Sequence, residues 1–321
     1  KDGVSEVQKL QMITQKGSNV DVAALHGNFD DAQSGVKALF EDEAFAEVLN
    51  EKGFQLSSAN SINIGRLVPQ VVYYVYAYAK LLAYGEIEDG EEINVTVPTG
   101  NFGNILAAYY AKQMGVPIAK LICASNENRV LFDFFKTGVY DKNRAFVLTT
   151  SPSMDILISS NLERLIYLIA GEDSECTRKL MEALKTDGRY EITDEMKEKL
   201  ADFAGGYADE MQTSQEIKNV YEDTGYVLDT HTAVASYVCK MWKEEQDNGK
   251  KCLIASTASP YQAAKNGEKT AAETMQITQT VFAKVKRAAA AVIGRNKGIF
   301  GALAAMVLLF VLIATSLSSC G

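Results

Sequence analysis

The feature that most constrains the fold is a strand–loop–helix–strand run at residues 93–124. A β-rich stretch ends at Pro98, and the chain passes through the loop TGNFGN into an apolar helical stretch at residues 103–114. A second apolar run, residues 118–124, has the length and composition of another strand. Strands joined by a helical crossover pair in parallel, because a hairpin needs only a short turn. The run therefore predicts an α/β fold with a parallel sheet and functional residues at the carboxyl ends of its strands.

The rest of residues 1–262 fits this class. Hydrophobic spacing predicts further strands at residues 19–25 and 251–256 and helices at residues 29–40, 64–82, 161–170, 194–203 and 232–242. A tyrosine-rich stripe on the helix at residues 64–82 is typical of core or subunit-interface packing rather than of a ligand site.

Charge and cysteine usage exclude several classes. The 321 residues carry a net charge of −9, which argues against nucleic acid as the main partner. Five scattered cysteines without C-x-x-C spacing indicate a reducing compartment, and two histidines make a multi-histidine metal site improbable, so no metal ligands are assigned.

The average charge hides a boundary near Gln262. Residues 263–321 contain seven Lys or Arg against two Glu, which leaves 25 Lys or Arg against 39 Asp or Glu for residues 1–262. We expect an acidic body at residues 1–262, a basic linker at residues 263–298 and an apolar segment at residues 299–317.

The segment at residues 299–317 contains no charged residue. Its length matches the ~20 residues that a helix needs to cross a membrane, whereas a buried core helix is the alternative. The basic cluster before it predicts a cytoplasmic body anchored to a membrane. A signal peptide is excluded by position.

The loop after residue 98 has the features of an anion site. Gly100 and Gly103 permit positive φ and close backbone approach, so several N–H groups can face one anion at the start of the next helix. An ordinary strand–helix turn with a glycine cap is the alternative. The sequence contains neither G-x-x-x-x-G-K-[ST] nor G-x-G-x-x-G, which argues against a nucleotide P-loop and a dinucleotide fingerprint.

Four motifs in order resemble those of threonine synthases, which have the tryptophan-synthase-β-like fold type II of pyridoxal-phosphate enzymes. They are PTGNFGN at residues 98–104, SSANSINIGR at residues 57–66, DTHTAVA at residues 229–235 and STASP at residues 256–260. The resemblance covers roughly residues 1–261.

The resemblance implies a role for each motif. The N–H groups of the loop would hold the phosphate of pyridoxal 5′-phosphate; the residues are Gly100, Asn101, Phe102, Gly103 and Asn104. Thr257 or Ser256 would offer a hydroxyl to the pyridine nitrogen. A third set would bind the phosphate or carboxylate of the substrate: Asn60, Ser61, Asn63 and Arg66. For that set the alternative is a polar helix cap followed by an exposed arginine. His231, in the motif at residues 229–235, is either a catalytic histidine or a hydrogen-bonded core histidine at the start of a helix.

The reaction implied is the conversion of O-phospho-L-homoserine and water to L-threonine and phosphate. Two other readings remain: a catalytically dead remnant tethered to a membrane, and another fold-type-II enzyme such as a threonine dehydratase or cysteine synthase. The second is disfavoured by the segments at residues 60–66 and 256–260.

The chain lacks the lysine that such chemistry requires. The family carries it in an F-K-D context well before the phosphate loop, and no such segment occurs here. Lys1-Asp2-Gly3 is rejected, because the residues after it resemble a later loop of the family. We therefore expect a family sequence truncated at its N-terminus, inactive as given, and fused after residue 262 to an unrelated tail.

Overall fold

The computed structural model describes residues 13–14, 17–23, 29–58, 61, 63–246 and 248–258. Its centre is a four-stranded sheet in the order β5-β2-β1-β6. The strands are β1 (Ile93–Pro98), β2 (Ile118–Ser125), β5 (Phe203–Tyr207) and β6 (Cys252–Ile254). Every neighbouring pair is parallel, so all four carboxyl ends lie at one edge. This confirms the predicted α/β class.

Both faces of the sheet are covered. All six residues of β1 are buried, as in parallel strands with helices on each side. Along β2, Leu121 and Cys123 belong to one apolar cluster and Ile122 and Ala124 to another, because successive side chains point to opposite faces.

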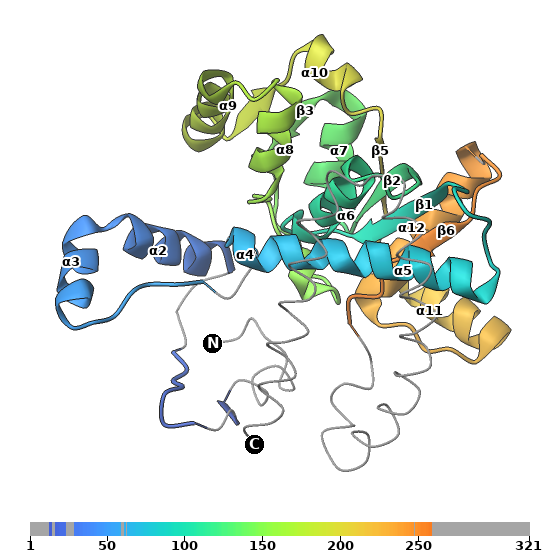
Figure 1. Cartoon of the computed structure of the whole chain (residues 1–321), viewed down its shortest axis with the longest axis horizontal. Helices are drawn as coiled ribbons and strands as arrows, with labels where there is room; N and C mark the ends of the chain where they lie inside the picture. Colours follow the sequence, from blue (N-terminus) through green and yellow to red (C-terminus); the bar gives the residue numbers. More distant parts are fainter. Residues whose placement is uncertain are drawn as a thin grey trace.

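Different helices cover the two faces. The first face carries α6 (Gly103–Gln113), with α5 (Val71–Tyr84) packed against it across the front in Figure 1. The second face carries α12 (Thr230–Gln246), which packs against α11 (Glu210–Thr224).

A smaller unit sits above the sheet in Figure 1. It contains the antiparallel pair β3 (Val139–Asp141) and β4 (Arg189–Glu191), whose Tyr140 and Tyr190 rings stack at 5.3 Å. The helices of this part are α7 (Val130–Thr137), α8 (Leu162–Ile169), α9 (Ser174–Thr186) and α10 (Asp194–Glu198), and the turn η2 (Pro152–Met154) precedes α8.

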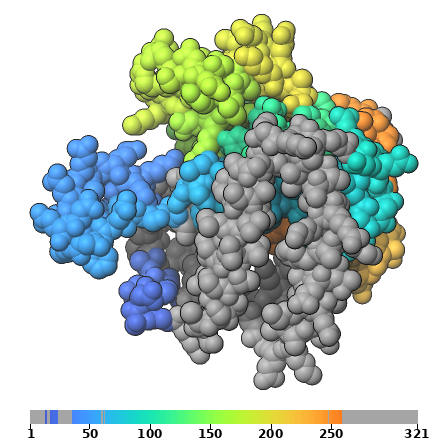
Figure 2. Space-filling model, viewed as in Figure 1, coloured from blue at the N-terminus to red at the C-terminus, as the bar shows by residue number. Residues whose placement is uncertain are grey.

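Two helices project from the body: α2 (Phe29–Glu41) and α3 (Glu43–Glu51). No side chain of α3 is buried, and Figure 2 shows both helices as a separate lobe. The lobe exposes large apolar residues, namely Val36, Leu39, Phe40, Phe45 and Val48.

Several predicted boundaries are wrong. Residues 19–23 form no strand. The helix expected at residues 64–82 is divided into α4 (Ile64–Leu67), the 3₁₀ turn η1 (Val68–Gln70) and α5, since Pro69 interrupts the hydrogen-bond pattern. The helix expected at residues 194–203 ends at Glu198, and β5 begins at the position where that helix was expected to end.

The apolar segment at residues 299–317 and the linker before it lie outside the described residues. Within the part of the chain that the structure describes, no helix has both the length and the apolar character needed to span a membrane.

Candidate active site

The loop after β1 is fixed where it leaves the sheet. The N–H of Thr99 donates to the carbonyl of Ala124 on β2 at 2.8 Å, and the Thr99 hydroxyl donates to the carbonyl of Val97 at 2.7 Å. At the other end of the loop, Phe102 is the N-cap of α6. The loop thus joins two rigid elements of the core.

The bend of the loop depends on Phe102, whose backbone is left-handed, with φ 63° and ψ 0°. This corrects the expectation that Gly100 or Gly103 supplies a positive φ, because neither does. A left-handed non-glycine residue costs roughly 1–2 kcal/mol. Burial of the ring offsets that cost: Phe102 is 1% exposed, and its ring centroid lies 5.9 Å from those of Phe135 and Phe203.

The two glycines are needed for close approach. A Cβ on Gly100 would lie 2.4 Å from the carbonyl oxygen of Ser153, and a Cβ on Gly103 would lie 2.9 Å from Ser61 Oγ. The first neighbour is backbone and cannot move aside easily. The close approach at these positions is to the protein's own atoms, and the approach of this backbone to a bound anion stays a prediction.

The N–H side of the loop is free. Within the described residues, none of the backbone N–H groups from Gly100 to Asn104 donates a hydrogen bond, and no side chain caps α6. The first N–H groups of a helix have no partner inside the helix and carry the positive end of its dipole. A run of consecutive free donors at this position suits an anion such as a phosphate.

The carbonyls of Gly100 and Asn101 in the same loop accept hydrogen bonds from the segment before α8. Asn161, which precedes α8 and is completely buried, donates its backbone N–H and its Nδ2 to the carbonyl of Asn101 at 3.1 and 2.9 Å. Its Nδ2 also donates to Ser61 Oγ at 3.0 Å, and the Ser159 hydroxyl donates to the carbonyl of Gly100 at 2.8 Å. These bonds turn the carbonyls toward the protein.

A buried carboxylate holds the segment behind Gly100. Asp155, 4% exposed, accepts from Asn126 Nδ2 at 2.7 Å, from Asn128 Nδ2 at 3.1 Å and from the N–H and hydroxyl of Thr149 at 2.9 and 2.7 Å. Because these groups are all paired, the network rigidifies the turn that carries Ser153.

Ser256 and Thr257 follow β6 at the same edge of the sheet as the loop. The parallel pairing of β6 with β1 places them there, and the N–H of Ala255 continues it by donating to the carbonyl of Thr96 at 2.9 Å. Both residues are exposed, and Thr232 Oγ1 at the start of α12 donates to Ser256 Oγ at 3.3 Å. The structure therefore gathers at one edge the two motifs that are expected to bind the cofactor.

The proposed substrate motif is only partly described. Asn60 lies outside the described residues, whereas Ser61 reaches the loop through Asn161. Asn63 caps α4, with its Oδ1 accepting from the N–H of Gly65 at 2.9 Å, which fits the helix-cap alternative. Arg66 is exposed on α4, a helix that contacts α6.

His231 lies at the start of α12 beside Asp229. The Asp229 carboxylate accepts from the backbone N–H groups of His231 and Thr232 at 2.9 and 3.1 Å, and His231 Nδ1 lies 3.3 Å from its Oδ1. Partial burial of Asp229 acts to raise its pKa, but the hydrogen bonds from His231 and Thr232 lower the pKa on balance. Asp229 is thus a helix cap.

Asn161, Ser159 and Asp155 are the residues near the loop for which sequence reasoning gave no site role. For Ser159 and Asn161 the signal is the polar run at residues 159–161 directly before the apolar helix α8, whereas Asp155 lies before that run, separated from it by three apolar residues. The loop residues that Ser159 and Asn161 contact lie 59 and 60 positions away, so the sequence alone does not show these contacts.

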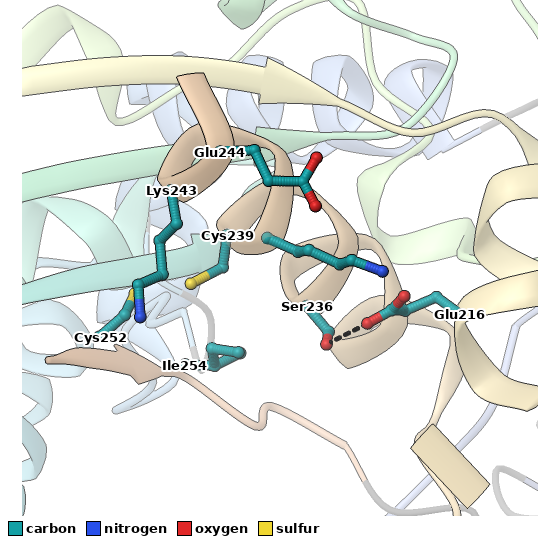
Figure 3. A pocket seen from close by; sticks show the side chains of 8 residues that line it. Glu216, Ser236, Cys239, Lys243, Glu244, Cys252 and Ile254 are labelled. Atoms are coloured by element: carbon teal, nitrogen blue, oxygen red, sulfur yellow. Dashed lines mark hydrogen bonds between the residues drawn. The ribbon is translucent and has the colours of Figure 1, made fainter. Parts of the chain in front are cut away.

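A hollow of about 620 Å³ lies between α11, α12 and β6 (Figure 3). Its walls include Glu216, Cys239, Lys243 and Cys252, and none of the loop residues. It is separate from the candidate active site.

Comparison with known proteins identifies the family. No protein-family model matches the chain. The chain is 46% identical over 260 residues to threonine synthase-like 1 of Pongo abelii, covering 80% of this chain and 35% of that protein. It is 37% identical over 278 residues to threonine synthase of Saccharomyces cerevisiae, covering 81% of this chain and 52% of that protein.

A solved structure agrees. The PLP-bound threonine synthase of Brucella melitensis superimposes with a TM-score of 0.69 at 37% identity, covering 86% of this chain and 58% of that one. The chain thus spans about a third to a half of the length of the two curated relatives. Its sequence and its sheet both place it in the threonine synthase family of pyridoxal-phosphate-dependent lyases.

Proposed function

We propose that this chain carries the phosphate-binding part of a threonine synthase active site. The free N–H groups from Gly100 to Asn104 would hold the phosphate of pyridoxal 5′-phosphate, and a hydroxyl of Ser256 or Thr257 would meet the pyridine nitrogen. The observation that carries this proposal is the run of unused donors beside the segment that follows β6. The cofactor of the Brucella relative supports the same assignment.

The proposed reaction converts O-phospho-L-homoserine and water to L-threonine and phosphate. The bound cofactor supplies an electron sink for negative charge developing on the substrate. This chain contributes binding: Ser61, Arg66 and the undescribed Asn60 would receive an oxyanion of the substrate, with Asn63 holding the start of α4. An arginine fork suits a phosphate or carboxylate.

We further propose that this chain binds the cofactor without turning over substrate. None of its lysines occurs in the F-K-D context expected for the covalent attachment. Backbone N–H groups hold a phosphate without a lysine, so binding and turnover are separable in this chain.

Titration of the full chain with pyridoxal 5′-phosphate, followed by ³¹P NMR, tests the binding. We expect saturable binding that inorganic phosphate competes away. Gly100→Ala should weaken it at least tenfold, because the new Cβ would lie 2.4 Å from the Ser153 carbonyl. Gly35→Ala is the matched control, since nothing lies within 4 Å of a Cβ at that position on α2. Equal binding by both variants would refute the loop assignment.

Borohydride treatment tests the proposal that the chain binds the cofactor without a covalent link and without turning over substrate. We expect no cofactor to be fixed covalently to the protein and no threonine to form from O-phospho-L-homoserine. Stoichiometric covalent labelling of a lysine would overturn the proposed inactivity while leaving the phosphate loop intact.

The alternative of a threonine dehydratase or cysteine synthase is disfavoured by the family to which the chain belongs. Activity of a complete relative on O-acetylserine rather than on O-phospho-L-homoserine would favour it.

A further inference from the structure

Two cysteines share one wall of the hollow between α11, α12 and β6. Cys239 lies on α12 and Cys252 opens β6, and Figure 3 shows their sulfur atoms pointing toward each other across the gap between helix and strand. The proposed function uses neither residue.

Both cysteines line the hollow, and their sulfur atoms face each other (Figure 3). Thr96 Oγ1 on β1 lies 3.1 Å from Cys252 Sγ, which holds the Cys252 side chain in place at the start of β6. Cys239 is 5% exposed and Cys252 is partly exposed, so a small reagent entering the hollow meets this pair at its wall.

The surrounding charges distinguish the two sulfurs. Lys243 lies one turn beyond Cys239 on α12, Lys240 and Glu244 line the same hollow, and Glu216 on α11 is engaged by the Ser236 hydroxyl at 2.7 Å. The neighbouring Cys252 thiol is the main cause that lowers the pKa of Cys239, with Thr96 and Lys243 adding to it and burial opposing it. The same interaction and burial raise the pKa of Cys252.

We propose that Cys239 and Cys252 form a thiol-oxidation site, with Cys239 as the attacking sulfur and Cys252 as the resolving one. The co-reactant is a low-molecular-weight disulfide. The Cys239 thiolate attacks one sulfur of that disulfide, which forms a mixed disulfide and releases one thiolate. Cys252 then attacks Cys239 Sγ and releases the second. The two protons of the protein thiols pass to the two released thiolates, so two small thiols and one protein disulfide result.

The product would join α12 to β6. Only Leu253, Ile254 and Ala255 separate Cys252 from Ser256, so the link would tie the segment proposed to meet the pyridine ring to the helix that starts with Thr230. Reversible linkage of this kind suits a reducing compartment, where disulfides are usually transient or redox-sensing.

Peptide mapping after exposure to oxidised glutathione tests the site. The full chain is incubated near neutral pH, quenched with acid and digested with trypsin without reduction. We expect the peptide ending at Lys240 to be joined to the peptide beginning at Cys252, and dithiothreitol to separate them. In the Cys252→Ser variant the reaction should stop at a glutathione adduct on Cys239. In the Cys239→Ser variant little glutathione adduct should form on Cys252.

Cys176→Ser is the control, because Cys176 lies on α9 away from the hollow and its loss should leave the link unchanged. The peptide map of the wild-type chain tests the link even if a variant fails to fold. Absence of the 239–252 link under conditions in which Cys176 takes up glutathione would overturn the proposal. So would a link that forms only after the protein is unfolded in urea.

Discussion

At the scale of single residues, some groups of the candidate site could be predicted from the sequence and others could not. The loop at residues 99–104 and its glycines could be predicted from local spacing, because a strand, a tight turn and a helix follow one another directly. The left-handed Phe102 could not, since its conformation is supported by rings from α7 and β5. The same is true of Asn161, whose side chain connects Ser61 to Asn101 across long sequence separations.

Asn161→Ala should destabilise the fold and the loop together. It leaves the Asn101 carbonyl with one donor fewer and Ser61 Oγ without its partner, and a buried unsatisfied polar group costs about 1–3 kcal/mol. Urea denaturation measures the change in free energy of unfolding. Asn219→Ala is the control, because Asn219 is bonded only on the exposed face of α11 and should cost under about 0.5 kcal/mol. Equal losses in both variants would contradict the role of Asn161.

At the scale of elements, the hydrophobic periodicity of the sequence identified the helices and strands that are continuous and apolar. The predicted strands near β1 and β2 and the helix between them were confirmed within two residues. The strand β5 was missed because its centre is Gly205-Gly206, a weak strand signal. The structure explains the glycines: a Cβ on Gly205 would lie 3.3 Å from Phe132 Cα, and one on Gly206 would lie 2.5 Å from a methyl of Val238.

Asp229→Ala should shorten or loosen the start of α12. Loss of this cap should cost about 0.5–2 kcal/mol near neutral pH. The pKa of Asp229 is lowered in the folded protein, so its contribution is present above its unfolded value of about 3.9 and is lost as pH falls through the folded value. The stability difference between wild type and variant should therefore be constant above about pH 5 and shrink in acid. A pH-independent difference in thermal unfolding would contradict this assignment.

Helices α2 and α3 should exchange their amide hydrogens far faster than β1 and β2. An isolated helix shorter than about 12–15 residues is marginal in water, and α3 buries no side chain. Hydrogen exchange read by mass spectrometry should give near-unprotected rates for residues 35–51 and strong protection for β1. Comparable protection in the two regions would show that the lobe is stabilised by contacts beyond those described.

At the scale of the whole molecule, the topology assembles the site. Motifs that lie more than 150 residues apart in the sequence meet because β6 is the parallel neighbour of β1. The rule that ligands bind at the carboxyl ends of parallel strands points to the edge at which these motifs lie. It does not predict the strand order, which depends on packing against α6 and α12.

The full chain should be found with membranes, and a form that lacks residues 282–321 should not. The reason lies in the sequence: a basic cluster precedes an uncharged segment long enough to cross a bilayer. Fractionation of cells expressing both forms measures the effect, with deletion of residues 263–270 as a control that keeps the apolar segment. Recovery of the full chain in the detergent-free supernatant would contradict the membrane assignment.

The late position of β6 also matters while the protein is being made. Thr96 on β1 leaves the ribosome long before its neighbour Ile254, so translation exposes an open sheet edge until nearly the whole described fold has been synthesised. An unpaired edge is a template for wrong pairing. A nascent chain arrested before Cys252 would therefore carry the loop at residues 99–104 beside an edge of β1 that is still unpaired.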